Sequence, residues 1–222
     1  MTTLYQRQLQ YIFNHPVTEP AWYWTDFWEE GVFENDPMCS FLFIETLLQN
    51  AKEDLSPFSD GQIGLGLNYI FNNCCSNLAD DFKVADVPVE RKVAAIKSLF
   101  GLFRDVLNPR CHKVLSAFSK DAIAPLSYIC YMFWDITPIA IWNNVPSKEG
   151  KAYYEAIAFV MQECLYLSNP ACVESALHGL GHLVGTQTAI AKPIIENYLK
   201  NKKNKNVTLK NYAEMALTGT IL

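Results

Sequence analysis

The sequence lacks the marks of a secreted or disulfide-bonded protein. Its first residues, MTTLYQRQLQYIFNH, have neither the basic start nor the apolar core of a signal peptide. The seven cysteines are an odd number and contain no C-x-x-C pair, so neither a disulfide framework nor a paired-cysteine zinc motif is predicted. Several lie in apolar runs such as LSYICYMF, as free core cysteines do. We therefore expect a cytoplasmic protein.

Motifs of common enzyme classes are also missing. The sequence has no phosphate-binding loop, no G-x-S-x-G elbow and no H-E-x-x-H. Gly61, Gly64 and Gly66 form a G-x-x-G-x-G pattern, but they lie inside a helical run and do not follow a strand. This pattern favours close helix packing over a dinucleotide site.

Strand-like alternation is absent too, and nearly every segment has apolar residues at helical spacing. Helix starts are marked by Ser59 or Asp60, by Pro88, and by Asn169 followed by a first-turn proline. The apolar stretch Ile123–Trp142 carries Asp135 and two prolines, so we interpret it as a core helix with a proline break and not as a membrane span. An all-α fold is predicted.

Two segments near the C-terminus are similar to each other. VESALHGLGHL aligns with AEMALTGTIL, with identities at a spacing of 40 residues (214 − 174) at four pairs: Glu174/Glu214, Ala176/Ala216, Leu177/Leu217 and Gly179/Gly219. The stretch VESALHGLGHLVGTQTAIAKPIIENYLK resembles one HEAT-like repeat of the ARM-type superhelix class, most clearly over residues 170–222.

This resemblance implies a right-handed superhelix, an α solenoid of stacked antiparallel helix pairs with roughly 10–12 helices. We expect one domain over residues 1–222. Residues 1–87 would be its irregular acidic part, and residues 88–222 would hold the HEAT-like pairs.

Glu174, His178 and His182 follow one another at steps of four, so a helix puts them on one face. Two imidazoles at that spacing can bind one metal, with Glu174, Cys164 or Cys172 as candidates for a third ligand. The same helix has Ala and Gly at packing positions, which favours histidines in interhelical hydrogen bonds. We predict no metal and no cofactor, and keep the metal site as an alternative.

Charge is divided between the two parts of the chain. Residues 1–90 hold fourteen acidic and three basic residues (3 − 14 = −11), whereas the other 132 hold nine acidic and fifteen basic residues (15 − 9 = +6). The lysines of KPIIENYLKNKKNKNVTLK indicate a solvated helix end, with an anionic contact as the alternative. Such asymmetry favours a basic partner for the acidic part.

Aromatic and acidic residues alternate in AWYWTDFWEEGVFENDP, residues 21–37. If this segment is helical, it is either a core layer with a solvated acidic face or a partner surface, because Trp and Tyr dominate interface hot spots. No basic residue lies among the aromatics, so no nucleic acid is expected. The predicted partner-binding residues are Trp24, Trp28, Glu29, Glu30, Glu34 and Asp36.

The function expected from these features is a non-enzymatic protein–protein interaction module. Its acidic N-terminal part would bind a basic protein partner, as immunity or inhibitor proteins do. Neither nucleic acid nor membrane is expected as a partner. The alternative is an enzyme on the HEAT-like scaffold, of the DNA glycosylase or lyase type, although the net charge of −5 opposes DNA binding.

Overall fold

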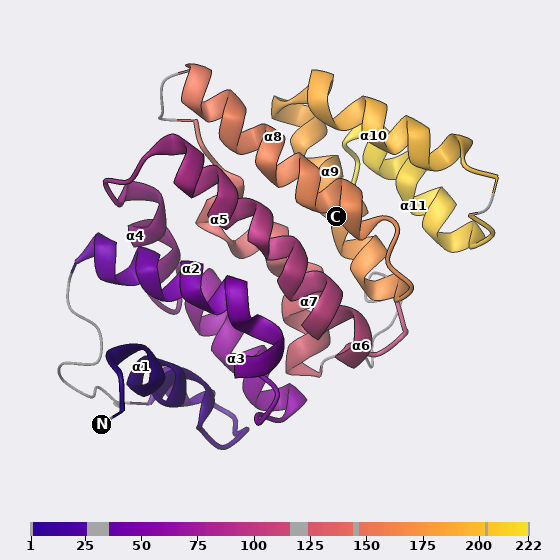
Figure 1. The fold of residues 1–222 in the computed structure, drawn as a ribbon. Coiled ribbons are helices and arrows are strands. Elements are labelled where there is room, and N and C mark those ends of the chain that lie inside the picture. The colour runs from indigo at the N-terminus through magenta and orange to yellow at the C-terminus, as the bar shows by residue number, and fades with distance from the viewer. Residues whose placement is uncertain (1, 26–35, 116–123, 144–146, 203, 222) are drawn as a thin grey trace.

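A computed structural model describes residues 2–25, 36–115, 124–143, 147–202 and 204–221 (Figure 1). Within these ranges the chain is helical and has no strand, which confirms the all-α prediction. Its α-helices are α1 (Leu4–Phe13), α2 (Pro37–Asp54), α3 (Asp60–Phe71), α4 (Leu78–Val84), α5 (Val89–Leu102), α6 (Asn108–Arg110), α7 (Pro125–Ile136), α8 (Ser147–Cys164), α9 (Pro170–Thr186), α10 (Thr188–Lys200) and α11 (Val207–Thr218).

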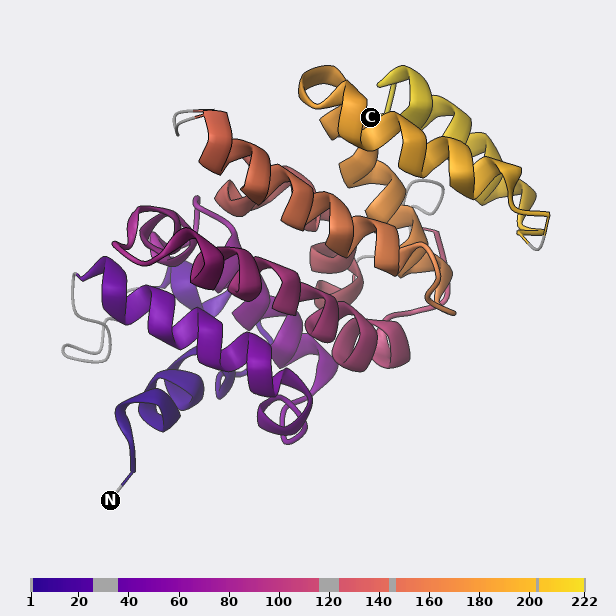
Figure 2. The same cartoon turned by 45° about the horizontal axis from the view of Figure 1, so that its top comes forward.

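Most of the helices lie in two rows (Figure 1 and Figure 2). In one row α2 packs on α5 and α5 packs on α8, while in the other α3, α7, α9 and α11 pack in succession. Helix α10 lies against both α9 and α11. The fold is therefore a set of packed helix pairs, and α7 and α9 are neighbours in its second row.

The predicted helix starts are confirmed. Ser59 forms a capping box with Gln62 before α3, and α5 begins directly after Pro88. Asn169 accepts a hydrogen bond from the backbone N–H of Ala171, and Pro170 is the first residue of α9. The cap at Asn169 fixes where α9 begins, and so which of its residues reach α7.

Glycines let three helices approach closely, as the glycine pattern predicted. A Cβ on Gly64 of α3 would lie 2.3 Å from the backbone nitrogen of Leu126 in α7. A Cβ on Gly66 would lie 2.3 Å from the ring of Phe13 in α1. Real Cβ atoms do not approach other atoms so closely, so a larger residue at either position would force its neighbours to shift.

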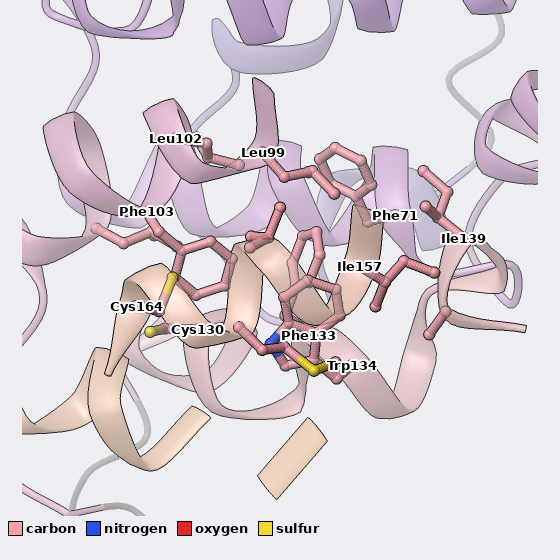
Figure 3. Close-up of a cluster of buried hydrophobic side chains, with 14 of the residues drawn as sticks. Phe71, Leu99, Leu102, Phe103, Cys130, Phe133, Trp134, Ile139, Ile157 and Cys164 are labelled. Atoms are coloured by element: carbon pink, nitrogen blue, oxygen red, sulfur yellow. The ribbon is translucent and has the colours of Figure 1, made fainter. Parts of the chain in front are cut away.

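The interior of the fold is aromatic where α3, α5, α7 and α8 meet (Figure 3). The ring of Phe133 in α7 lies 4.9 Å from that of Phe71 and 5.4 Å from that of Phe103, and Trp134 stacks on Phe103 at 5.8 Å. These contacts fix α7 on two sides of its axis. Asp135 is the next residue along the chain, in the last turn of this packed helix.

The stretch predicted as a core helix with a proline break is confirmed over its described residues, 124–142. Helix α7 ends at Ile136, and Pro138 begins a 3₁₀ turn. Among the described helices, none combines the length and the apolar character needed to cross a membrane. All seven cysteines are free, and the four at positions 111, 130, 164 and 172 are buried, as expected of core cysteines.

The glycine contacts lead to a stability prediction. Gly64→Ala should lower the free energy of unfolding by about 2–3 kcal/mol, because the added methyl group must push the backbone of α7 away. This loss corresponds to a melting temperature lower by about 5–10 °C. Gly185→Ala is the matched control, since a Cβ there meets no atom within 4 Å; it should be neutral or stabilise α9 by up to about 1 kcal/mol. Equal effects of the two substitutions would contradict this packing.

Candidate metal centre

Asp135 lies in the last turn of α7, among apolar neighbours. The backbone dipole of a helix disfavours a carboxylate at this end, so Asp135 needs positive or hydrogen-bond-donating partners from elsewhere. Helix α9 provides them. Its His178 and His182 are one turn apart and both face Asp135.

The three side chains meet at short distances. Nε2 of His178 lies 2.8 Å from Oδ2 of Asp135, and Nε2 of His182 lies 2.5 Å from Oδ1. The two Nε2 atoms are 3.1 Å apart. The side chain of His178 is 1% exposed and that of His182 is 48% exposed, so one side of the group is buried and the other faces outward.

No arrangement of protons turns all three contacts into hydrogen bonds. If both Nε2 atoms carry a proton and donate to Asp135, the contact between the two nitrogens has no acceptor. If only one Nε2 carries a proton, that proton satisfies one contact, and lone pairs face each other in another. A cation among the three groups would use every lone pair at once. A hydrogen-bonded group, in which each Nε2–H donates to its own oxygen of Asp135, and a cation bound by all three side chains both fit these contacts.

The spacing of the ligand atoms also fits a metal. One ligand atom from each residue lies within 4.8 Å of the other two. With bonds of about 2.0–2.1 Å, ligand atoms are about 3.3 Å apart in a tetrahedral site and about 3.0 Å apart at adjacent octahedral positions. The two Nε2 atoms, 3.1 Å apart, already have this spacing, whereas Nε2 of His182 and Oδ1 of Asp135, 2.5 Å apart, would have to separate by about 0.5–0.8 Å to bind one ion.

The electrostatics of Asp135 support its ionised form. Burial would raise the pKa of this carboxyl, but the hydrogen bonds and charges of His178 and His182 outweigh burial and lower the pKa to about 2. Asp135 is therefore a carboxylate at neutral pH, which is the form that binds a metal.

Tyrosines lie behind the buried histidine. Nδ1 of His178 is 2.5 Å from the hydroxyl oxygen of Tyr212 in α11, and the hydroxyl of Tyr131 lies 3.4 Å from that of Tyr212. Burial raises the pKa of Tyr212, so its hydroxyl stays protonated. If Nδ1–H of His178 donates to this oxygen, Nε2 keeps its lone pair for a metal. Such a partner is the usual outer contact of a metal-binding histidine.

A pocket opens on the exposed side of the group. It has a volume of about 300 Å³, and its wall includes Asp135 and His182 but not the buried His178. A cation held by the three side chains would therefore have protein on one side and the pocket on the other. Coordination positions on the pocket side would be open to water or to a small molecule.

Of the predicted partner-binding residues, the structure describes only Trp24 and Asp36, and neither belongs to this group. Residues 22–24 form a short 3₁₀ turn and Thr25 is extended, so the helix considered for residues 21–37 is not formed over residues 22–25. Trp24 is 59% exposed, and Asp36 caps α2 by accepting a hydrogen bond from the backbone of Met38. The other four predicted residues, Trp28, Glu29, Glu30 and Glu34, lie outside the described residues.

The sequence analysis identified both histidines of the group but not its third member, Asp135. The proposed candidates were Glu174, Cys164 and Cys172, and none of them belongs to the group that the structure brings together. Asp135 lies 43 residues before His178. What distinguishes it in the sequence is that it is the only charged residue in the apolar stretch 123–142. Tyr212 gave no signal in the sequence. The expectation that the histidines make interhelical hydrogen bonds is confirmed.

Comparison with known proteins adds no relative. No protein-family model matches the chain, and neither the curated proteins nor the solved structures give a significant match. The function must therefore be inferred from the geometry of the described residues.

The low pKa of Asp135 predicts part of the acid stability of the metal-free protein. Since the pKa falls from 3.8 to about 2 on folding, the carboxylate stabilises the fold above pH 4 and loses this effect as the pH falls through about 2. Asp135→Asn should therefore show a shallower loss of stability between pH 4 and 2 than the unchanged protein. Denaturant unfolding with a chelator present measures this slope, and identical slopes would contradict the assignment.

Proposed function

We propose that this protein binds one divalent transition-metal ion through Asp135, His178 and His182. The observation that carries the proposal is the convergence of one carboxylate and two imidazoles, with one ligand atom of each within 4.8 Å of the others, at the wall of a pocket. Burial of His178, its contact with Tyr212 and the ionised state of Asp135 support it further. The proposal departs from the expectation of no metal, which was formed without knowledge of a third ligand.

The type of site follows from its ligands. Structural zinc sites usually have four protein ligands, whereas catalytic ones have three and an open position for water or substrate. Two histidines and one carboxylate are found in zinc hydrolytic sites and in non-haem iron(II) sites. We therefore propose Zn²⁺ or Fe²⁺ in a site of the catalytic type, acting on a small molecule that enters the adjoining pocket.

For the scaffold we propose the HEAT-like superhelix that the sequence resembles. The two rows of helices support it, as does the packing of α9 against α11, the two helices related by the spacing of 40 residues. Ala176 and Ala216 are both fully buried, as equivalent packing positions would be. In this arrangement the metal centre bridges neighbouring helices of one row.

Metal binding can be tested directly. Chelator-treated protein should take up one equivalent of Zn²⁺ or Co²⁺ in a calorimetric titration, and elemental analysis should find one ion per chain after gel filtration. His182→Ala and Asp135→Asn should each weaken binding at least a hundredfold, because each removes one of three ligands. Tyr212→Phe should weaken binding about 10–100-fold, as loss of an outer contact does.

His112→Ala is the matched control, because this exposed histidine lies outside the group. It should leave both affinity and stoichiometry unchanged. Binding that survives His182→Ala and Asp135→Asn, or that is lost in His112→Ala, would contradict the proposed site.

A second function, binding of a basic protein by the acidic N-terminal part, is supported by one observation. Trp24 is 59% exposed and lines a shallow groove with Val17, Leu65 and Pro125. A large exposed aromatic side chain beside the acidic segment is the composition expected of an interface. Substituting Glu29 and Glu30 by Lys should then slow association with the partner severalfold at low salt.

Two neighbouring tryptophans test whether this surface is free for a partner. Trp22 is 4% exposed and stacks on His15 at 4.1 Å, so Trp22→Ala should cost about 3–5 kcal/mol of stability. Trp24→Ala should change stability by less than about 0.5 kcal/mol. Both losses can be measured as shifts in melting temperature. A large loss in Trp24→Ala would show that Trp24 belongs to the core and not to an interface.

A further inference from the structure

The walls of the pocket beside the metal centre are mostly apolar. Trp134 of α7, Met161 of α8 and Leu183 of α9 line it and are themselves buried. Ile141, from the segment after α7, is 53% exposed and lies at the mouth. An apolar group that enters the pocket would leave water for a surface of indole, thioether and aliphatic carbon.

Polar side chains are few and uncharged, apart from the proposed ligands. Tyr154 accepts a hydrogen bond from the backbone N–H of Trp142 and donates one to Oδ1 of Asn143, so its hydroxyl is already used within the protein. Asn143 and Thr186 also line the pocket and are exposed at its mouth. These two side chains can orient a ligand but cannot balance a charge.

The described lining of the pocket includes neither lysine nor arginine. A phosphate or carboxylate group would therefore have no cationic side chain to bind it away from the metal. The volume of about 300 Å³ is at the lower end of the range of about 300–1,000 Å³ found for small-molecule sites. The pocket therefore suits a small molecule whose body is uncharged.

Resting on the proposed metal function, we propose that this pocket binds a small molecule with an uncharged aromatic or aliphatic body. An oxygen or nitrogen donor group of this molecule coordinates the metal on the side of Asp135 and His182. Its apolar body lies against Trp134, Met161 and Leu183. The metal supplies affinity for the donor group, and the apolar wall supplies selectivity for the body.

Two hydroxamic acids with the same metal-binding group test this proposal on the Co²⁺-loaded protein. Acetohydroxamate carries a methyl group and benzohydroxamate carries a phenyl ring. Both should change the visible absorption of the bound cobalt, because the donor group enters its coordination sphere. Benzohydroxamate should bind at least tenfold more tightly, since only its ring buries substantial apolar surface. Elemental analysis after gel filtration checks that the cobalt stays on the protein.

Substitutions at the mouth separate the pocket from the metal. Thr186→Trp places a large side chain at the pocket and should reduce the preference for benzohydroxamate to less than threefold, while cobalt binding is unchanged. Thr188→Trp is the control, because Thr188 is also exposed but does not line the pocket. It should keep the full preference.

The possible outcomes are distinct. If cobalt binds but the two hydroxamates have equal affinities, or if Thr186→Trp leaves the preference intact, the proposal for the pocket is overturned and the metal function stands. Hydroxamates that remove the cobalt from the protein overturn it as well. If cobalt itself does not bind, the metal function fails and this proposal fails with it.

Discussion

The close packing of α7 against α9 is the constraint on which the candidate site depends. Gly179 of α9 makes it possible, because a Cβ there would lie 2.6 Å from Cγ of Trp134 and 2.5 Å from the terminal methyl carbon of Met161. Without a side chain at this position, the two helices approach until Asp135 reaches both histidines. The lack of a Cβ at Gly179 thus allows the close packing that brings the polar group next to the aromatic core.

The polar group in turn connects three helices of one row. Asp135 belongs to α7, His178 and His182 to α9, and Tyr212 to α11. Buried polar groups are costly unless every partner is satisfied, so such a network favours one arrangement of the helices over others. A bound cation would strengthen the same arrangement, because the metal binds the folded ligand set and not the unfolded chain. Metal binding would therefore stabilise this half of the fold.

Local signals predicted the helices well, whereas the site depended on contacts between distant segments. The caps at Ser59 and Asn169 follow from short-range chemistry and are confirmed. The repeat alignment paired Gly179 with Gly219, yet the first permits a helix contact and the second ends α11 at a φ of 70°. The contact of Asp135 with the two histidines could not be predicted, because the periodicity of a sequence does not indicate which face of α7 packs against α9.

A crystal of the zinc-loaded protein, measured on both sides of the zinc absorption edge, tests the central claim most directly. Our account predicts one anomalous-difference peak per chain, at about 2.0–2.2 Å from Nε2 of His178, Nε2 of His182 and an Oδ of Asp135. On the pocket side of the zinc ion, there should be electron density for a non-protein ligand bound to it. A peak at other side chains, or none between α7 and α9 in a crystal that contains zinc, would contradict the account.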